Sequence, residues 1–213
     1  MSHGLGEAFW EEQYRGRAAH HQPRPNANLV SEATDLATGR ALDAGCGEGA
    51  DAIWLASRGW QVTAVDFAST ALERARANAA DLDTEVAGRI DWVHADLTAC
   101  TPPAGRFDLV SAQYVHVPDA ARGSLFQRLA AAVAPGGTLL VAGHHPSDLD
   151  TTVARGEDPG LYVTTEQIAA SLDPDRWEIV VAESRSRTES DHHGHGEVAV
   201  QDTVLRAHRI QSP

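Results

Sequence analysis

The chain has 213 residues, of which 42% are hydrophobic and 22% are charged, as expected of a globular domain with a sizeable core. It has 30 acidic and 17 basic residues and a net charge of −13. All of the basic residues are arginine, which excludes lysine Schiff-base chemistry and a Walker-type phosphate loop, and the charge disfavours nucleic-acid binding. The polar N-terminus, the two cysteines and the lack of a long apolar run predict a cytoplasmic protein without a membrane segment.

Two short helices are predicted at the N-terminal end of the chain. The spacing of Phe9, Trp10 and Tyr14 predicts a helix over about residues 7–14. A proline-containing loop, HHQPRPNANLV, then leads to a second helix near residues 29–36.

Strands and helices alternate from residue 40 onward. The predicted strands are, in order, ALDAG, WQVTAVD, IDWVHAD, FDLVSAQYV and TLLVAGHH, followed by RWEIVVAESR and VAVQDTVLRAHR. Helices are predicted over 50–57, 69–80 and 119–133, and from Thr164 or Thr165 onward. Ser69 is expected to cap the second of these helices, and Pro135-Gly136-Gly137 to close the third.

This order predicts an α/β fold of the doubly wound kind. Strands that alternate with helices form a mostly parallel sheet with helices on both faces. No helix separates the last two strands, so we expect them to pair as an antiparallel hairpin, unlike the ending of a plain dinucleotide-binding fold.

The stretch LDAGCGEG places a glycine-rich turn between the first strand and its helix. Its spacing fits the dinucleotide fingerprint, but it also fits a plain strand-to-helix connection. The charges separate the possible ligands. Asp43 and Glu48 would lie beside a pyrophosphate with no nearby arginine, whereas S-adenosylmethionine carries a sulfonium and an ammonium and no phosphate. An acidic turn therefore favours S-adenosylmethionine.

Two further carboxylates end the next two predicted strands. Asp66 ends the second strand, where a carboxylate can accept hydrogen bonds from both ribose hydroxyls, as NAD would also require. Asp96 ends the third strand, where it can accept a hydrogen bond from an adenine amino group, with Leu97 supplying a backbone N–H. Each acid alone is typical of a surface strand end, but acids ending three successive strands along one sheet edge indicate a ligand site.

In these motifs the chain resembles the class I S-adenosylmethionine-dependent methyltransferases, from about Arg40 to Arg209. LDAGCGEG, VTAVD, HADL, FDLVSAQYVHV, APGGTLLV and the final strand pair carry the resemblance. A narrower similarity to the small thiopurine and tellurite-resistance type is suggested by FWEEQYRGR, by PNANLV and by the compact length. The resemblance implies a seven-stranded sheet with an antiparallel last strand, S-adenosylmethionine as cofactor and S-adenosylhomocysteine as product.

It also implies roles for individual residues. The turn and Asp43 would lie by the methionine end, Asp66 on the ribose, Asp96 and Leu97 on the adenine, and Gln113 near the cofactor. The predicted cofactor-binding residues are Trp10, Tyr14, Asp43, Gly45, Cys46, Gly47, Asp66, Phe67, Asp96, Leu97 and Gln113. Trp10 and Tyr14 either pack in the core or close as a lid over the sulfonium, in which case Arg15 would hold a carboxylate. We expect one domain over 1–213, with residues 1–38 as this helical lid and 39–213 as the core.

Histidines follow several of the strands that end at this edge. We predict Tyr114, His116 and His145 as catalytic residues, because their loops border the transferable methyl group in this family. His20 and His21 lie in the N-terminal loop. The run DHHGHGE, with Asp191, His192, His193 and His195, invites a metal site, but neighbouring histidines in a glycine-containing turn seldom converge, so we predict no metal.

The expected function is methyl transfer to a small molecule through a thiol or other chalcogen, an oxygen or a nitrogen nucleophile. The alternatives are an NAD-dependent oxidoreductase and a non-catalytic cofactor-binding protein. We expect neither a nucleic-acid nor a membrane partner, and a monomer or homodimer.

Overall fold

The computed structural model describes residues 6–16, 24–151, 153, 158–190 and 196–211. Seven strands form a single sheet in the order β3-β2-β1-β4-β5-β7-β6. The strands are β1 (Arg40–Ala44), β2 (Gln61–Asp66), β3 (Ile90–His94), β4 (Phe107–Gln113), β5 (Val133–His144), β6 (Trp177–Ser190) and β7 (Glu197–Arg209). β7 runs antiparallel to both of its neighbours, and the other pairings are parallel. The predicted doubly wound fold, with its antiparallel last strand, is confirmed.

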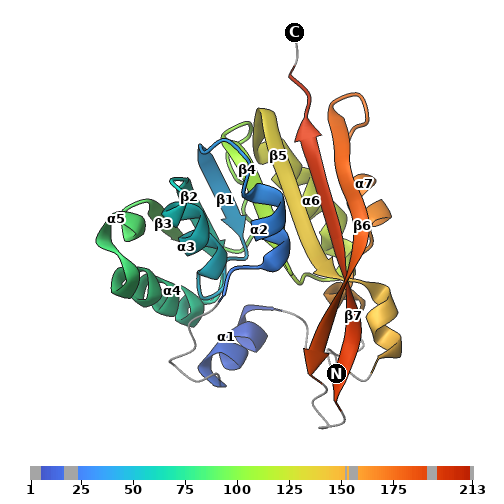
Figure 1. The fold of residues 1–213 in the computed structure, drawn as a ribbon, viewed down its shortest axis with the longest axis horizontal. Helices are drawn as coiled ribbons and strands as arrows, with labels where there is room; N and C mark the ends of the chain where they lie inside the picture. Colours follow the sequence, from blue (N-terminus) through green and yellow to red (C-terminus); the bar gives the residue numbers. More distant parts are fainter. Residues whose placement is uncertain (1–5, 17–23, 152, 154–157, 191–195, 212–213) are drawn as a thin grey trace.

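The helices cover the two faces of this sheet (Figure 1). They are α1 (Glu7–Gly16), α2 (Ala27–Ala33), α3 (Ala50–Ser57), α4 (Ser69–Leu82), α5 (Thr84–Ala87), α6 (Asp119–Ala132) and α7 (Thr165–Ala169), with short 3-10 turns η1 (Pro146–Asp150) and η2 (Pro159–Leu161). No helix in these described stretches is long and apolar enough to cross a bilayer.

The core has one apolar cluster on each face of the sheet. On one face Leu29 of α2, Leu55 of α3 and Leu72 of α4 pack together. On the other, Leu125 of α6 and Ile168 of α7 pack against the opposite side of the same strands. The central strands are buried on both faces, which is why they read as near-continuous apolar runs in the sequence.

Two local predictions were wrong because partners distant in the sequence decide these positions. Ala68 and not Ser69 is the N-cap of α4, and the Ser69 hydroxyl instead donates to a carboxylate oxygen of Glu11, 2.8 Å away. Pro135-Gly136-Gly137 does not close α6. The helix ends at Ala132, and the Pro-Gly-Gly segment belongs to β5, where the register against β4 shifts.

The glycines of that segment serve a bulge in β5. Gly136 has a φ of +80°, and a Cβ on Gly137 would lie 2.9 Å from the Asp108 carbonyl oxygen of β4. The extra residues therefore form a bulge within the strand. A bulge favours glycine, as a helix end does, so the sequence pattern alone fits both. Among the remaining elements, α2 spans Ala27–Ala33 where residues 29–36 were expected, and the one-turn helix α5 was not predicted.

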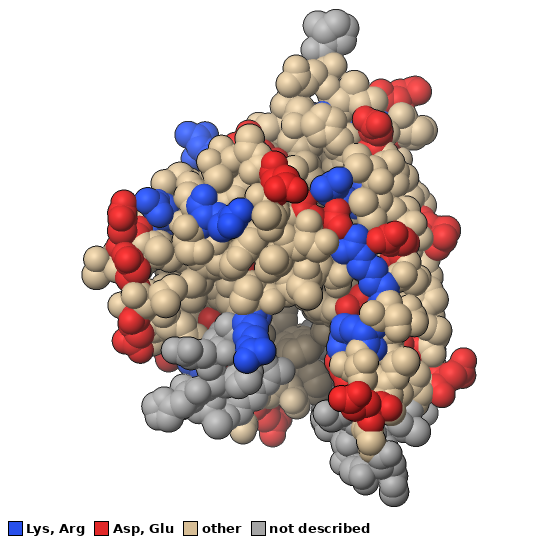
Figure 2. Space-filling view, in the orientation of Figure 1, with Lys and Arg blue, Asp and Glu red and all other residues tan. Residues whose placement is uncertain are grey.

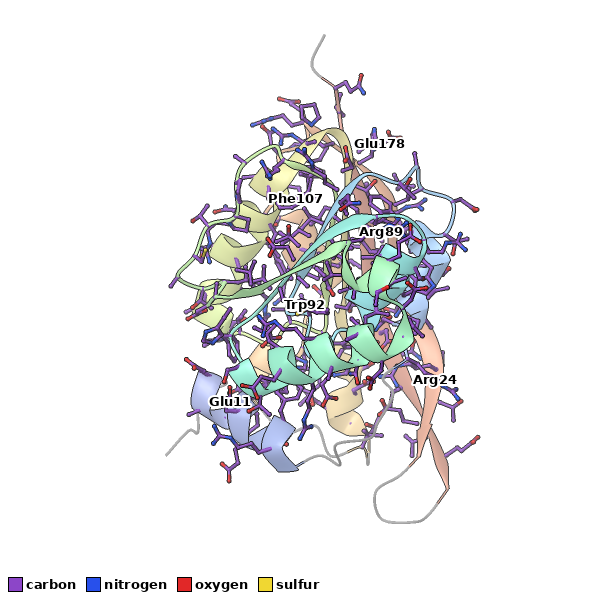
Figure 3. The ribbon with its side chains drawn as sticks, turned by 90° about the vertical axis from the view of Figure 1, so that its left-hand side faces the viewer. Glu11, Arg24, Arg89, Trp92, Phe107 and Glu178 are labelled. Atoms are coloured by element: carbon purple, nitrogen blue, oxygen red, sulfur yellow. The ribbon has the colours of Figure 1, made fainter. Side chains whose placement is uncertain are left out.

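The parallel strands bring their carboxyl ends to one edge of the sheet, and α1 lies beyond that edge (Figure 1). Seen from the side, Glu11 and Arg24 lie at this end of the molecule, and Arg89 and Phe107 lie toward the other (Figure 3). The strand order reverses between β1 and β4, and that switch point is where open α/β sheets bind their ligands.

Candidate active site

The turn between β1 and α3 depends on three glycines in the left-handed conformation. Gly45, Gly47 and Gly49 have φ values of +74°, +52° and +86°. A Cβ on Gly47 would lie 2.8 Å from the Tyr14 hydroxyl oxygen, and one on Gly45 would lie 2.9 Å from Val115 Cγ2. Conformation therefore favours glycine at all three positions, and at Gly45 and Gly47 the neighbouring side chains leave no space for a Cβ.

Three carboxylates gather at the base of this turn. Burial raises the pKa of Asp43 on β1 well above its usual range, and the charges of Asp51 and Asp66 raise it further. Burial also raises the pKa of Asp51, in the first turn of α3, to about 6. Like charges held together away from water disfavour the ionised forms, so a cation bound among them would relieve the repulsion.

Asp66 holds the glycine turn in place. One of its carboxylate oxygens accepts the Gly47 N–H at 2.8 Å, and the other accepts the Ala68 N–H at 2.8 Å. Its side chain is buried, and burial raises its pKa. Each oxygen has a second lone pair, so the carboxylate can still accept a hydrogen bond from a ligand.

Two buried acceptor oxygens lie at the ends of the adjacent strands β1 and β4. Asp43 Oδ2 and Gln113 Oε1 have no hydrogen-bond partner among the described residues. Gln113 Nε2 donates to Ser111 Oγ at 3.0 Å, which fixes the direction of the amide. A buried acceptor without a donor costs about 1–3 kcal/mol, so a ligand that carries N–H groups fits this place.

Two cavities open at this edge and share Asn26 and Tyr114. The first has a volume of about 200 Å³ and is lined by the glycine turn and by Tyr14, Arg24, Asp51 and Gln113, among others. The second has a volume of about 380 Å³ and is lined by Asn26, Ala27, Asn28, Tyr114, His144, Arg187, Glu189 and Asp202. Tyr114 therefore stands between a cavity at the glycine turn and a larger one toward the β6–β7 hairpin.

Aromatic rings form a continuous stack beside these cavities. Trp10 of α1 stacks on His116 at 5.4 Å between ring centroids, and His116 stacks on His144 at 5.3 Å. The Tyr114 ring lies 4.6 Å from that of His144. Tyr114 has a φ of +52°, a strained value for a residue other than glycine, of the kind found at functional sites. Burial, and then the Asp202 carboxylate, raise the pKa of its phenol, which stays neutral.

The predicted site residues are distributed as follows. Trp10, Tyr14, Cys46, Gln113, Tyr114 and His116 lie at the turn or in the stack. His145 caps η1 instead, with its Nδ1 facing the Ser147 N–H at 3.2 Å, and it lines neither cavity. Its neighbour His144 takes the place in the stack. His20, His21, Asp191, His192, His193 and His195 lie outside the described residues.

Three predicted cofactor residues lie at the β2 and β3 side of the edge. Asp96 is two residues beyond the end of β3, and its Oδ1 accepts both the N–H and the hydroxyl of Thr98 at 2.7 Å. Leu97 is buried, and the Phe67 carbonyl oxygen lies 2.7 Å from His94 Nε2. Their roles toward a cofactor stay predictions.

Two arginines have partners that sequence reasoning missed. Arg74 of α4 forms an ion pair with Glu48 at 2.8 Å, so the turn does have a nearby arginine, and Glu48 adds no uncompensated charge. Arg15 pairs with Glu11 at 3.4 Å and is largely exposed. The acidic character of the turn therefore comes from Asp43, Asp51 and Asp66.

Glu11 fastens α1 to the core at the start of α4 (Figure 3). Its carboxylate accepts the Ser69 hydroxyl at 2.8 Å and the Thr70 N–H at 3.1 Å, and a further bond comes from the Thr70 hydroxyl. These bonds, that of the Thr70 side chain first, lower its pKa to about 2. A carboxylate at a helix N-terminus is also favoured by the helix dipole.

Replacing Glu11 by alanine is therefore expected to lower the free energy of unfolding by about 1–2 kcal/mol, the usual effect of losing a cap. The exposed neighbour Glu12 is the matched control, and Glu12→Ala should change the free energy by less than about 0.5 kcal/mol. Urea unfolding followed by tryptophan fluorescence measures both variants. Equal effects of the two would show that Glu11 does not hold α1 in place.

Comparisons with known proteins identify the family. Residues 41–137 match the family described as "Methyltransferase domain". An uncharacterized methyltransferase of Mycobacterium bovis is 40% identical over 153 residues, which cover 69% of this chain and 70% of that protein. The chain belongs to the class I S-adenosylmethionine-dependent methyltransferases. The predicted family and cofactor are confirmed.

Two further comparisons place the methyltransferase among its relatives. The trans-aconitate 2-methyltransferase of Rhizobium meliloti is 33% identical over 144 residues, 66% of this chain but only about half, 51%, of that enzyme. TehB from Haemophilus influenzae has the same fold, with a TM-score of 0.69 and 15% identity, over 96% of this chain and 67% of that one. This likeness in fold agrees with the narrower resemblance drawn from the sequence.

Several residues of the methyltransferase's candidate site were not predicted. These residues interact with partners that lie elsewhere in the sequence, and no local motif predicts such pairs. They are Glu11, Asp51, Arg187 and Asp202. The one available signal lies in the hairpin, where charged residues alternate along the predicted sixth strand at Glu183, Arg185, Arg187 and Glu189.

Proposed function

We propose that this methyltransferase transfers a methyl group to a small molecule held in the 380 Å³ cavity beside Tyr114. The observation that carries the proposal is the combination of crowded carboxylates and unpartnered acceptor oxygens at the glycine turn. That combination suits a ligand with a cationic sulfur and an ammonium group and opposes a pyrophosphate. It therefore speaks against the nicotinamide-dinucleotide alternative.

Different residues at the turn are proposed to bind different parts of the cofactor. In the proposal, Asp43 and Gln113 accept hydrogen bonds from its amino-acid end, and Asp66 accepts those of the ribose. The backbone of Gly45, Cys46 and Gly47 makes close contact. The buried Cys46 thiol, whose pKa is raised by burial, fills a small gap and is not a nucleophile.

At the outer end of β3, Asp96 and Leu97 are proposed to bind the adenine, with Phe67 beside them. Trp10 and Tyr14 form a lid from residues 1–38, which closes over the core of 39–213. Tyr14 already touches the turn, and Trp10 already covers His116.

When bound, S-adenosylmethionine supplies a methyl group on a good leaving group, so the protein's share is alignment and exclusion of water. Tyr114 lines both cavities, His144 lines the larger one, and His116 stacks on His144. His116 is proposed to take the proton of an acceptor that arrives protonated, such as an alcohol or ammonium. A thiol acceptor would ionise in part without help.

The relatives support a small acceptor. The trans-aconitate 2-methyltransferase is named for a small molecule, and it is similar to this chain over 144 residues. The cavity volume of about 380 Å³ lies in the range of small-molecule sites. Sulfur or another chalcogen, oxygen and nitrogen all remain candidate nucleophiles.

The proposal predicts that binding of S-adenosylhomocysteine depends on pH. Its ammonium group favours ionised carboxylates, and the Asp51 pKa of about 6 means that most Asp51 is protonated at pH 5. The dissociation constant should therefore rise at least about tenfold from pH 7.5 to 5, and binding near pH 6 should release protons. Calorimetry in buffers of different ionisation enthalpy measures both effects.

Asp51→Asn is the control for this titration, because asparagine keeps an oxygen to accept the Asn26 N–H. The variant should bind more weakly at pH 7.5 and show a smaller change with pH. The raised pKa of Asp51 should also affect the stability of the protein without cofactor. Its folded form binds more protons than the unfolded chain between about pH 4 and 6, so stability should fall as the pH rises through that window. A dissociation constant independent of pH would contradict the role of these carboxylates.

A further inference from the structure

A series of hydrogen-bonded charges connects α2 to the β6–β7 hairpin. Arg185 of β6 forms an ion pair with Glu32 and donates to Asn28 Oδ1 at 3.3 Å. Asn28 Nδ2 donates in turn to the buried carboxylate of Asp202 on β7 at 3.2 Å. Asp202 accepts from Arg187 Nε with both oxygens, at 2.8 and 3.0 Å. The series fixes Arg187 at the wall of the 380 Å³ cavity.

Arg187 keeps hydrogen-bond donors that the protein does not use. Its Nε is taken by Asp202, and its Nη1 is paired with Glu189. Nη2 has no partner among the described residues. The guanidinium carbon lies 5.9 Å from the centroid of the Tyr114 ring, so the unused donors are close to the residue that separates the two cavities.

The opposite side of the site also carries an arginine. Arg24 lines the 200 Å³ cavity, and its side chain has no partner in the part of the chain that the structure describes. Figure 2 shows a hollow in this face with arginine atoms on both sides. In a chain with a net charge of −13, two arginines with unused donors lie at the rim of the site, whereas its floor at Asp43, Asp51 and Asp66 is acidic.

We propose that Arg187 is a specificity-determining residue that binds a carboxylate on the methyl acceptor. This inference rests on the proposed function. The acidic floor suits the cationic cofactor, and the arginines of the rim suit an acceptor of the opposite charge. A guanidinium held rigidly by its Nε presents its remaining donors in a fixed plane, which matches the plane of a carboxylate.

The surrounding charges define how this recognition works. Arg187 together with Asp202 and Glu189 has a net charge of −1, so long-range attraction by this group alone does not draw in an anion. Asp202 is buried and accepts hydrogen bonds from Arg187 and Asn28, which stabilise its charge within the series, but it shares the cavity wall with Arg187. Recognition therefore depends on short-range hydrogen bonds from prepositioned donors, and it should be lost when those donors are removed.

Pairs of acceptors that differ only in a carboxylate test this inference. The pairs are 4-mercaptobenzoate and thiophenol, 3,4-dihydroxybenzoate and catechol, and 4-aminobenzoate and aniline, each with a labelled methyl donor. For the nucleophile that the enzyme uses, the wild type should show at least a tenfold higher kcat/KM for the carboxylate member. Arg187→Gln should remove that preference, mainly through KM, and leave the dissociation constant of S-adenosylhomocysteine unchanged.

Arg176→Gln is the matched control. It removes an exposed guanidinium just before the same strand, from a residue that belongs neither to the series nor to the cavity wall, so the preference should remain. Binding of benzoate and benzyl alcohol in the presence of S-adenosylhomocysteine, followed by saturation-transfer NMR, gives a second readout that needs no turnover. Benzoate should bind to the wild type and to Arg176→Gln and not to Arg187→Gln.

The outcomes separate the two proposals. Methylation without a carboxylate preference, or benzoate binding that survives Arg187→Gln, overturns the role of Arg187 and leaves the methyltransferase proposal intact. Failure to bind S-adenosylhomocysteine with benzoate binding still dependent on Arg187 would overturn the cofactor assignment and support the carboxylate site.

Discussion

Replacing Gly47 by valine is expected to abolish measurable binding of S-adenosylhomocysteine, a loss of at least about 100-fold in affinity. Gly47 has a φ of +52°, where a β-branched residue is strained by about 1–3 kcal/mol. Its Cβ would also lie 2.8 Å from the Tyr14 hydroxyl oxygen, so the side chain would displace the lid and cover the turn. Titration calorimetry at pH 7.5 measures the effect.

Gly105→Val separates the site from general strain. Gly105 has a φ of +64°, but no atom lies within 4 Å of a Cβ built on it. The two variants therefore share the backbone penalty, and only the one at Gly47 obstructs the site. Gly105→Val should bind the product with wild-type affinity. If both variants lose binding equally, the loss reflects destabilisation of the fold, and the turn is not the cofactor site.

Replacing His116 by alanine is expected to lower kcat about 100-fold for an acceptor that must lose a proton, the usual contribution of a general base. Affinity for S-adenosylhomocysteine should change by less than about threefold, because the acids that hold it are untouched. His116 stacks between Trp10 and His144 and lines the small space beside Tyr114. Steady-state kinetics measure the loss, with the acceptor that the paired compounds identify.

His145→Ala is the control for this experiment. His145 was predicted beside His116 as a catalytic residue, but its ring caps η1, so its loss should lower kcat by less than about threefold. The acidic limb of the pH–rate profile should disappear with His116→Ala and persist with His145→Ala. A larger loss of kcat with His145→Ala than with His116→Ala would show that His145, and not His116, is the general base.

The sheet and most helices could be predicted from the sequence because each depends on its own stretch of chain. The periodic apolar residues of β2 and α4 indicate where each element lies. The final hairpin follows from the lack of a helix between two strands. The wrong predictions concern positions whose structure depends on a residue distant in the sequence. Ser69 looked like a cap until Glu11, 58 residues away, supplied the carboxylate, and the glycines after α6 turned out to serve a bulge paired with β4.

The candidate site divides along the same line. The glycine turn, Asp43 and Asp66 belong to strand ends whose meeting at one edge follows from parallel pairing alone. Arg187, Asp202 and Glu11 form pairs between elements, and only the folded chain reveals them. The sequence correctly indicated buried acids beside the glycine turn. It was wrong about Glu48, because Arg74 of α4 forms an ion pair with that residue.

The site that results combines opposite charges in two layers. Buried carboxylates at the turn favour a cation, and the proposed role of Arg187 favours an anion in the larger cavity, with Tyr114 lining both cavities. Methyl transfer requires a cationic donor and an electron-rich acceptor to meet, so this arrangement is suited to hold both at once.

A crystal structure of the protein grown with S-adenosylhomocysteine tests the account most directly. We expect density for the whole product along the carboxyl ends of β1, β2 and β3, with its ammonium among Asp43, Asp51 and Gln113 and its ribose hydroxyls on Asp66. Density for the product elsewhere, or a glycine turn left unoccupied at saturating concentration, would contradict the claim that these acids bind the cofactor.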